Sequence, residues 1–110
     1  MSTDVAVRFA ALADPTRLAV LDLLADGGPQ KAGDIARRFP RISRPAVAKH
    51  LRVLKGAGLV GELVSGREHW YSLQPAPLAE VHKWVARYRT FWAGSLDSLA
   101  RLVQDDSMGL

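Results

Sequence analysis

The chain has 110 residues, 48% of them hydrophobic and 24% charged, a composition typical of one globular domain with a single modest core. It contains no cysteine, which excludes disulfides, thiolate metal sites and cysteine nucleophiles. The first residues do not form a secretion signal, and no apolar window approaches the length of a membrane span. We therefore expect a cytoplasmic protein without a membrane partner.

The net charge of +4 is unevenly distributed along the chain. Residues 31–67 hold nine basic and two acidic side chains, a net charge of +7, so the remainder carries −3. A concentrated basic segment beside a mildly acidic remainder is typical of a nucleic-acid-binding protein. If the partner is DNA, the protein is expected to associate with the nucleoid.

The N-terminal quarter predicts two helices. Residues 4–13 place Val5, Phe9 and Leu12 on one side of a first helix. Asp14-Pro15 is a start signal for a second helix, with the aspartate as N-cap and the proline in the first turn. The second helix is expected to bury Leu18 and to end at the Gly-Gly-Pro sequence of residues 27–29.

Residues 31–57 predict two more helices joined by a short turn. The first covers residues 31–39 and ends at Pro40, and Ile42 is expected to fill the corner between the two helices. The second begins after Ser43, an N-cap candidate, and Gly58 is placed to end it in a left-handed conformation. Two short helices in this arrangement are a helix-turn-helix.

The second of these helices has two distinct faces. Its apolar stripe consists of Val47, Leu51 and Leu54, at the spacing that faces a core. Lys49 and Arg52 lie on the opposite face, which contains no carboxylate. A solvated surface helix usually mixes acids with its bases, so this pattern favours a DNA recognition helix over an ordinary amphipathic helix.

Residues 59–73 change from a helical to an alternating period. Two strands flank Ser65-Gly66, a hairpin signal, and His69 and Tyr71 fall on one face while Trp70 falls on the other. A hairpin directly after a helix-turn-helix is a wing. Arg67 at its tip is a candidate to enter a minor groove, although a plain solvated turn residue is the alternative.

One apolar stripe continues through residues 77–103. Gly94 does not shift its phase, so we predict one long helix rather than two. About 27 residues at roughly 1.5 Å each would exceed what so small a domain can cover, which favours a partner helix from a second copy. The alternative is that Trp84, Phe91 and Trp92 only pack back on the first helix. The stripe consists of Leu78, Val81, Val85, Tyr88, Trp92, Leu96, Leu99 and Val103.

Three blocks of the chain resemble the ArsR/SmtB family of bacterial winged-helix repressors. They are FAALADPTRLAVLDLL at 9–24, SRPAVAKHLRVLKGAGLV at 43–60 and SGREHWYSL at 65–73. The resemblance covers nearly the whole chain. It implies a mainly α fold with a small β-hairpin, in the order α-α-α-α-β-β-α, as one domain spanning residues 1–110. It also implies a homodimer joined through residues 4–13 and 77–103, which represses transcription from an inverted-repeat operator in double-stranded DNA.

Site residues follow from the helix faces and this resemblance. We predict DNA contacts for Ser43, Arg44, Pro45, Ala46, Lys49, His50, Arg52 and Arg67. Of these, His50 has packing beside Leu51 as its alternative role. We predict a dimer interface containing Val5, Phe9, Val81, Val85, Tyr88, Trp92, Leu96 and Leu99.

The chain departs from the family at its metal sites. The thiolate site has no cysteines, and Glu80 with His82 supplies only half of the site on the last helix, because Ala93 stands where its repeat should be. We therefore predict neither a metal nor a cofactor. Three alternatives remain: a sensor that binds a small apolar molecule or a metal at the dimer interface, a protein-only interaction module, and an enzyme. No catalytic constellation supports the last of these.

Overall fold

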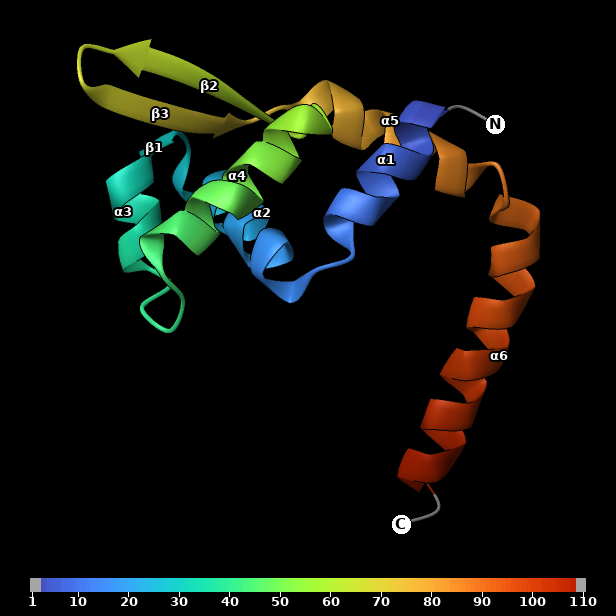
Figure 1. Cartoon of the computed structure of the whole chain (residues 1–110). Helices are drawn as coiled ribbons and strands as arrows, with labels where there is room; N and C mark the ends of the chain where they lie inside the picture. Colours follow the sequence, from blue (N-terminus) through green and yellow to red (C-terminus); the bar gives the residue numbers. More distant parts are fainter. Residues whose placement is uncertain (1–2, 109–110) are drawn as a thin grey trace.

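The computed structural model describes residues 3–108, except for the side chains of residues 3, 92, 96, 97 and 104–108. Figure 1 shows that α1 to α5 and the strands form one body, from which α6 extends. The Cα radius of gyration is 17.8 Å, against about 13 Å for a compact chain of this length, and the extended α6 accounts for the difference. In order, the elements are α1 (Thr3–Leu12), α2 (Pro15–Gly27), β1 (Gln30–Lys31), α3 (Ala32–Arg37), α4 (Arg44–Gly56), β2 (Val60–Ser65), β3 (Glu68–Leu73), α5 (Pro75–Ala86) and α6 (Arg89–Met108).

The predicted start and stop signals of α2 and α4 are confirmed, whereas the helix predicted to run to Phe39 ends at Arg37, before Pro40. The Asp14 carboxylate accepts a hydrogen bond of 3.0 Å from the backbone N–H of Arg17, which caps α2. Gly58, the second residue after the end of α4, adopts a φ of +76°, a conformation that glycine tolerates and other residues rarely adopt. These local signals fix the lengths of α2 and α4 and so determine which faces can pack.

The core lies between α2, α3, α4 and the base of the sheet. Its largest fully buried side chains are Leu24, Ile35, Leu51, Leu54, Leu59 and Val20. Phe39 and Ile42 pack against this cluster from the turn between α3 and α4, as predicted for Ile42. The prediction for Leu18 is wrong: this side chain is exposed, because α2 buries Val20, Leu21 and Leu24 and Leu18 lies well off the centre of that stripe.

The wing is part of a three-stranded antiparallel sheet with the order β1-β3-β2. The hairpin register pairs Val60 with Leu73 and Ser65 with Glu68, and Gly66 turns the chain with a φ of +61°. The third strand, β1, was not predicted. Its second residue, Lys31, was predicted as the first residue of the helix 31–39. Helix α3 is therefore shorter than predicted at its start, and it also ends two residues earlier, at Arg37.

The C-terminal prediction of one helix over residues 77–103 is wrong. The chain forms α5 and α6, and the break falls at Arg87-Tyr88, not at Gly94. At the break the backbone tightens, because the Tyr88 N–H donates to the Val85 carbonyl three residues earlier, at 3.1 Å. Figure 1 shows α5 beside α1 and α6 turning away from the body, so only α5 has a helix of its own chain to pack on. The observed order is therefore α-α-β-α-α-β-β-α-α, still mainly helical with a small sheet.

Candidate nucleic-acid interface

Helix α4 presents one face to the core and the other to solvent, as its sequence predicts. The Ser43 hydroxyl accepts a hydrogen bond of 3.2 Å from the Ala46 N–H and caps the helix, and Pro45 lies in the first turn. Val47, Leu51 and Leu54 are all buried. Because the caps and the buried stripe fix the rotation of α4 about its axis, the opposite face must point outward.

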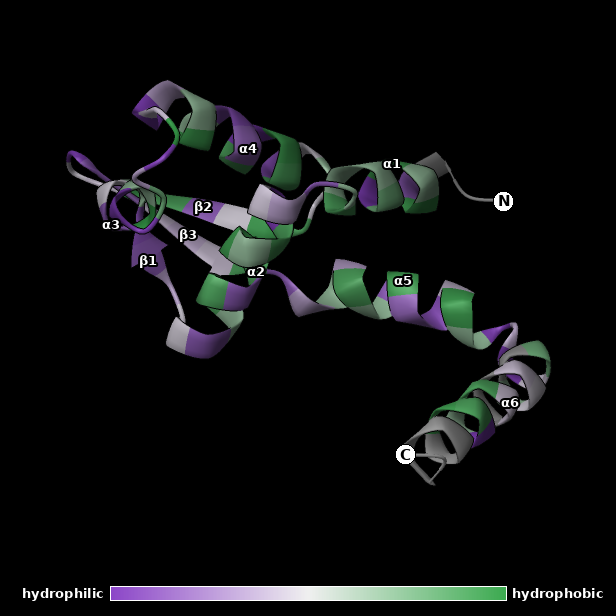
Figure 2. Cartoon of the chain, turned by 90° about the horizontal axis from the view of Figure 1, so that it is seen from below, coloured by the Kyte–Doolittle hydropathy of each residue, from purple (hydrophilic) through white to green (hydrophobic). Residues whose placement is uncertain are grey.

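The residues predicted to contact DNA divide into two groups by exposure. Six of them are exposed, namely Ser43, Arg44, Pro45, Lys49, Arg52 and Arg67, and two are half-buried, namely Ala46 and His50. Figure 2, coloured by hydropathy, shows hydrophilic and hydrophobic stretches alternating along α4, as expected for a helix with one face outside.

His50 is directed toward α2 rather than toward solvent. Its Nδ1 lies 3.3 Å from the Arg17 guanidinium and 3.9 Å from the Asp14 carboxylate, and its side chain is only 21% exposed. The same guanidinium donates to the carbonyls of Ala10 and Ala11 at the end of α1. The structure thus places His50 in a contact that joins α1, α2 and α4, which matches its predicted packing role.

The basic segment 31–67 contains two kinds of cation. Three of its side chains have a carboxylate partner: Lys31 with Glu68 at 3.1 Å, Arg37 with Asp34 at 2.9 Å, and Lys55 with Glu62 at 2.9 Å. The other six have no acidic partner among the side chains that the structure describes, and they are Arg38, Arg41, Arg44, Lys49, Arg52 and Arg67. An unpaired exposed cation keeps its full charge for an anionic partner, so these six define the candidate interface. Arg38 and Arg41 were not among the predicted site residues, because they belong neither to the second helix of the helix-turn-helix nor to the wing, from which those residues were chosen.

A carboxylate joins the C-terminal end of α4 to both strands of the wing. Glu62 on β2 accepts a hydrogen bond from the Tyr71 hydroxyl at 2.7 Å and from Lys55 Nζ at 2.9 Å, and it lies 3.0 Å from His69 Nδ1. We call these four residues the Glu62 cluster. The sequence predicted that His69 and Tyr71 share a face, but not that Glu62 meets them there.

The hydrogen bonds of the Glu62 cluster shift two pKa values in opposite directions. The bonds from Tyr71, Lys55 and His69 lower the pKa of Glu62 to about 2. Burial, followed by the bond to Glu62, raises the pKa of Tyr71 to about 12. Glu62 is therefore ionised and Tyr71 is protonated throughout the physiological range, and the cluster holds the wing against α4.

The residues predicted to form a dimer interface lie on α1, α5 and α6 and, for Tyr88, at the break between α5 and α6. Phe9, Val85, Tyr88 and Leu99 are exposed, and Val81 is half-buried. Val5 is only 7% exposed in the single chain, so it has little surface left for a partner and its assignment to the interface is not supported. The predictions for the side chains of Trp92 and Leu96 lie outside the described residues.

An aromatic cluster connects α1 to α5. Trp84 meets Phe9 edge to face, with ring centroids 5.4 Å apart, and stacks obliquely on Tyr88 at 5.1 Å. Trp84 therefore does pack back on the first helix, as one alternative predicted. The Phe91 side chain is 68% exposed.

The described residues contain neither a group of metal ligands nor a membrane-spanning helix. Glu80 and His82 are both exposed on α5, and no group of three or more acidic or histidine side chains in the described part of the chain could hold a metal ion. None of the helices within residues 3–108 combines the length and apolar character that a membrane span requires.

Comparison with known proteins identifies the family. A family described as a helix-turn-helix domain matches residues 12–61, which contain α2, α3 and α4. The chain is 42% identical to the HTH-type transcriptional regulator Rv2034 of Mycobacterium tuberculosis over 87% of its own length and 85% of that protein. It is 40% identical to the transcriptional repressor SdpR of Bacillus subtilis, over 73% of the chain and 87% of SdpR. The crystal structure of an ArsR family transcriptional regulator superposes with a TM-score of 0.74 at 31% identity, covering 82% of this chain and 91% of the other. The chain belongs to the ArsR family of transcriptional regulators.

Membership of the ArsR family accounts for the main features of the site. The protein is a DNA-binding transcriptional regulator with a helix-turn-helix and a wing. It is a cysteine-free ArsR protein, so no thiolate can serve as a signal receptor in this chain.

Proposed function

We propose that this ArsR protein is a homodimeric repressor that reads an inverted-repeat operator in double-stranded DNA with α4. The observation that carries the proposal is the outward face of α4, where Arg44, Lys49 and Arg52 have no acidic partner among the described side chains. This face lies opposite the buried stripe of α4. A helix of this kind enters the major groove with its N-terminal end. Binding beside a promoter would exclude polymerase, so repression follows from occupancy.

The unpaired cations take different roles according to their positions on this face. Arg44 lies in the first turn of α4 and is the candidate for bidentate contact with guanine, which contributes about 1–3 kcal/mol of discrimination between bases. Lys49, Arg52 and the wing-tip residue Arg67 neutralise phosphates, which gives affinity without sequence information. Ser43, Pro45 and Ala46 shape the N-terminal end of the helix against the groove.

A second copy of the chain supplies the other half of the binding surface. The exposed apolar side chains of Val85, Tyr88, Phe91 and Leu99 on α5 and α6 are a surface that a single chain leaves in water, and a two-fold partner would cover it. The two copies of α4 would then reach half-sites separated by about 10 base pairs or a multiple of that. If the dimer meets about 8 phosphates, log affinity falls with log salt with a slope near −7.

One observation favours a sensor as the second candidate function. A pocket of about 210 Å³ lined by Trp84, Val85, Tyr88 and Phe91 lies on the surface proposed for dimerisation. Its lining is apolar, so a small apolar molecule there would alter the dimer and release DNA. A sensor of this kind also binds DNA. It differs from the first candidate only in what releases the protein from DNA. We propose no catalytic activity, because the chain belongs to a family of regulators and not of enzymes.

Charge reversal on the outer face of α4 tests the proposal. We expect the double variant Lys49→Glu/Arg52→Glu to lose at least about 100-fold in affinity, because each charge-assisted contact contributes roughly 1.5–3 kcal/mol. The measurement is fluorescence anisotropy with a duplex from the promoter of the protein's own gene and with a random duplex. Melting temperature and sedimentation should match the unmodified protein, because both side chains are exposed.

The matched control is Lys31→Glu/Arg37→Glu, which changes the net charge equally but removes two cations that already have acidic partners. It should lose much less affinity. If both double variants lose the same amount, total charge and not the face of α4 determines binding. If Lys49→Glu/Arg52→Glu binds as the unmodified protein does, α4 is not in the groove.

A further inference from the structure

A second cationic site opens beside the turn of the helix-turn-helix. It is a pocket of about 300 Å³ lined by Thr16, Arg38, Phe39, Pro40, Arg41 and Ile42. The lining comes from two places that are distant in sequence: the first turn of α2 and the segment that joins α3 to α4. None of the six residues belongs to the face of α4 described above.

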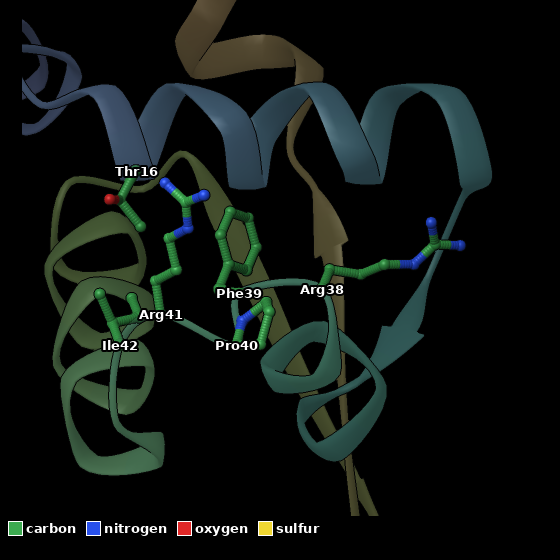
Figure 3. Close-up of a pocket in the computed structure, with 6 residues that line it drawn as sticks. All are labelled: Thr16, Arg38, Phe39, Pro40, Arg41 and Ile42. Carbon is green, nitrogen blue, oxygen red and sulfur yellow. The ribbon is translucent and has the colours of Figure 1, made fainter.

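The lining combines an apolar floor with a concentrated positive charge. Phe39, Pro40 and Ile42 supply the carbon surface, and Phe39 and Ile42 are fixed by packing on the core. Figure 3 shows the Arg41 guanidinium directed between Thr16 and the Phe39 ring, whereas the Arg38 side chain extends away from them. The Thr16 hydroxyl oxygen points away from this guanidinium, so Arg41 is the side chain placed to donate to an anion in the pocket.

No acid in the described part of the chain neutralises this pocket. Arg38 and Arg41 have no acidic partner there, and the two nearest acids along the chain are already engaged. Asp34 pairs with Arg37, and Asp14 accepts the backbone N–H of Arg17 as the cap of α2. An exposed guanidinium with no internal counter-ion is suited to a phosphate, which it can bind in bidentate fashion.

The pocket lies at the end of α4 that the proposed function directs into the groove. Arg41 precedes the N-cap Ser43 by two residues, and Arg44 follows the cap directly. A groove-bound α4 therefore brings the sugar-phosphate backbone that borders the groove close to the turn. The pocket is also wide open to solvent and at the lower limit of ligand-site volumes of about 300–1,000 Å³, so it would enclose little of a small molecule.

We propose that this pocket binds one backbone phosphate of the DNA that flanks the bases read by α4. Arg41 donates to the phosphate oxygens, and Phe39, Pro40 and Ile42 pack against the adjoining deoxyribose. The contact carries no base information, and it fixes the register of α4 along the groove. The inference rests on the proposed function, because it requires that α4 itself enters DNA.

The variant Arg41→Ala, compared with Arg37→Ala, tests the site. Both remove one exposed arginine near the turn, but Arg37 already has an acidic partner. We expect Arg41→Ala to lose about 10-fold in affinity for operator and random duplexes alike, and to lower the salt slope by about 1. Arg37→Ala should change neither quantity by as much.

Phosphate neutralisation separates this contact from a structural effect of the substitution. Replacing single flanking phosphates with uncharged methylphosphonates should identify one position that weakens the unmodified protein but has no effect on Arg41→Ala. If every methylphosphonate weakens both proteins equally, or if Arg41→Ala keeps full affinity and slope, the inference is wrong. The two failures are distinguishable, because an unmodified protein that does not bind DNA at all disproves the proposed function instead.

Inorganic phosphate, titrated at constant ionic strength against chloride, tests for a free anion at the same pocket. The inference predicts equal effects on the unmodified protein and on Arg41→Ala. If phosphate releases DNA only from the unmodified protein at millimolar concentration, the pocket is a site for a free anion and the assignment to the DNA backbone is wrong.

Discussion

The two ends of α4 differ in what their cations contact. At the N-terminal end, Arg44 is exposed and unpaired beside the Ser43 cap. At the C-terminal end, Lys55 is bound to Glu62, and the Ala57 carbonyl accepts a hydrogen bond of 3.3 Å from Arg8 on α1. One end is open to a partner and the other is attached to the wing and to α1. The difference shows that a basic residue does not have to contact DNA merely because it lies in a basic segment. If a carboxylate of the same chain already pairs with it, its charge is less available to DNA.

We call the C-terminal end of α4 the anchored end, because it is attached to the wing and to α1. This end also determines where the wing lies. The Glu62 cluster joins Lys55 of α4 to both strands of the hairpin whose tip carries Arg67. A hairpin attached only through its backbone would leave the distance between α4 and Arg67 variable. The cluster fixes that distance at the C-terminal end of α4, which is opposite to the end proposed to enter the groove.

The largest expected effect is on the stability of the fold, and it comes from a substitution on the buried face of α4. The substitution Leu54→Ala removes a fully buried side chain and should reduce the free energy of unfolding by about 2–5 kcal/mol. Urea unfolding, monitored by circular dichroism, measures this free energy. Val53→Ala, one residue earlier on an exposed part of the same helix, is the control and should cost much less. Equal losses would show that α4 is not packed as described.

The next effect separates the open end of α4 from the anchored end. Arg44→Ala should lose roughly 1–3 kcal/mol of discrimination between the operator and a duplex with one substituted guanine. Lys55→Ala should keep that discrimination, because Lys55 is held by Glu62 and not by DNA. Competition binding with a set of single-base variants measures both. A loss of base discrimination in Lys55→Ala would place the anchored end in the groove and reverse the orientation of α4.

Much of the fold could be predicted because its signals are local. The caps Asp14 and Ser43, the proline that follows near each, and the stripe of α4 all act within a few residues, and the structure confirms them. Strand β1 could not be predicted from periodicity, because it has two residues and forms only by pairing Gln30 and Lys31 with β3. The break at Arg87-Tyr88 could not be predicted either, since neither residue is a glycine or proline and the apolar spacing continues across it.

The candidate site could be predicted only where it follows a helical face. Arg44, Lys49 and Arg52 follow from the rotation of α4, and their roles remain a proposal. The pairing of Lys55 with Glu62 depends on where β2 folds relative to α4, and Glu62 meets Tyr71 because the hairpin register places them opposite each other. The pocket around Arg41 depends on α2, more than twenty residues earlier in the chain. Contacts of this kind are set by tertiary packing, which no local pattern in one sequence records.

The smallest effect concerns the anchored end alone and depends on pH. The pKa of Glu62 in the folded protein is about 2, below its ordinary value of 4.5, so folding favours the ionised carboxylate. Its contribution to stability is therefore fully present above pH 4.5 and is lost as the pH falls through about 2. In Glu62→Gln, thermal unfolding between pH 5 and pH 2 should depend less on pH. The pKa of Tyr71, measured by absorbance titration, should move down from about 12 toward 10.

Because Lys55 loses its carboxylate partner in Glu62→Gln, affinity for random DNA should rise slightly, whereas base discrimination by Arg44 should not change. If the unfolding profile of Glu62→Gln keeps the pH dependence of the unmodified protein, Glu62 does not hold the wing against α4.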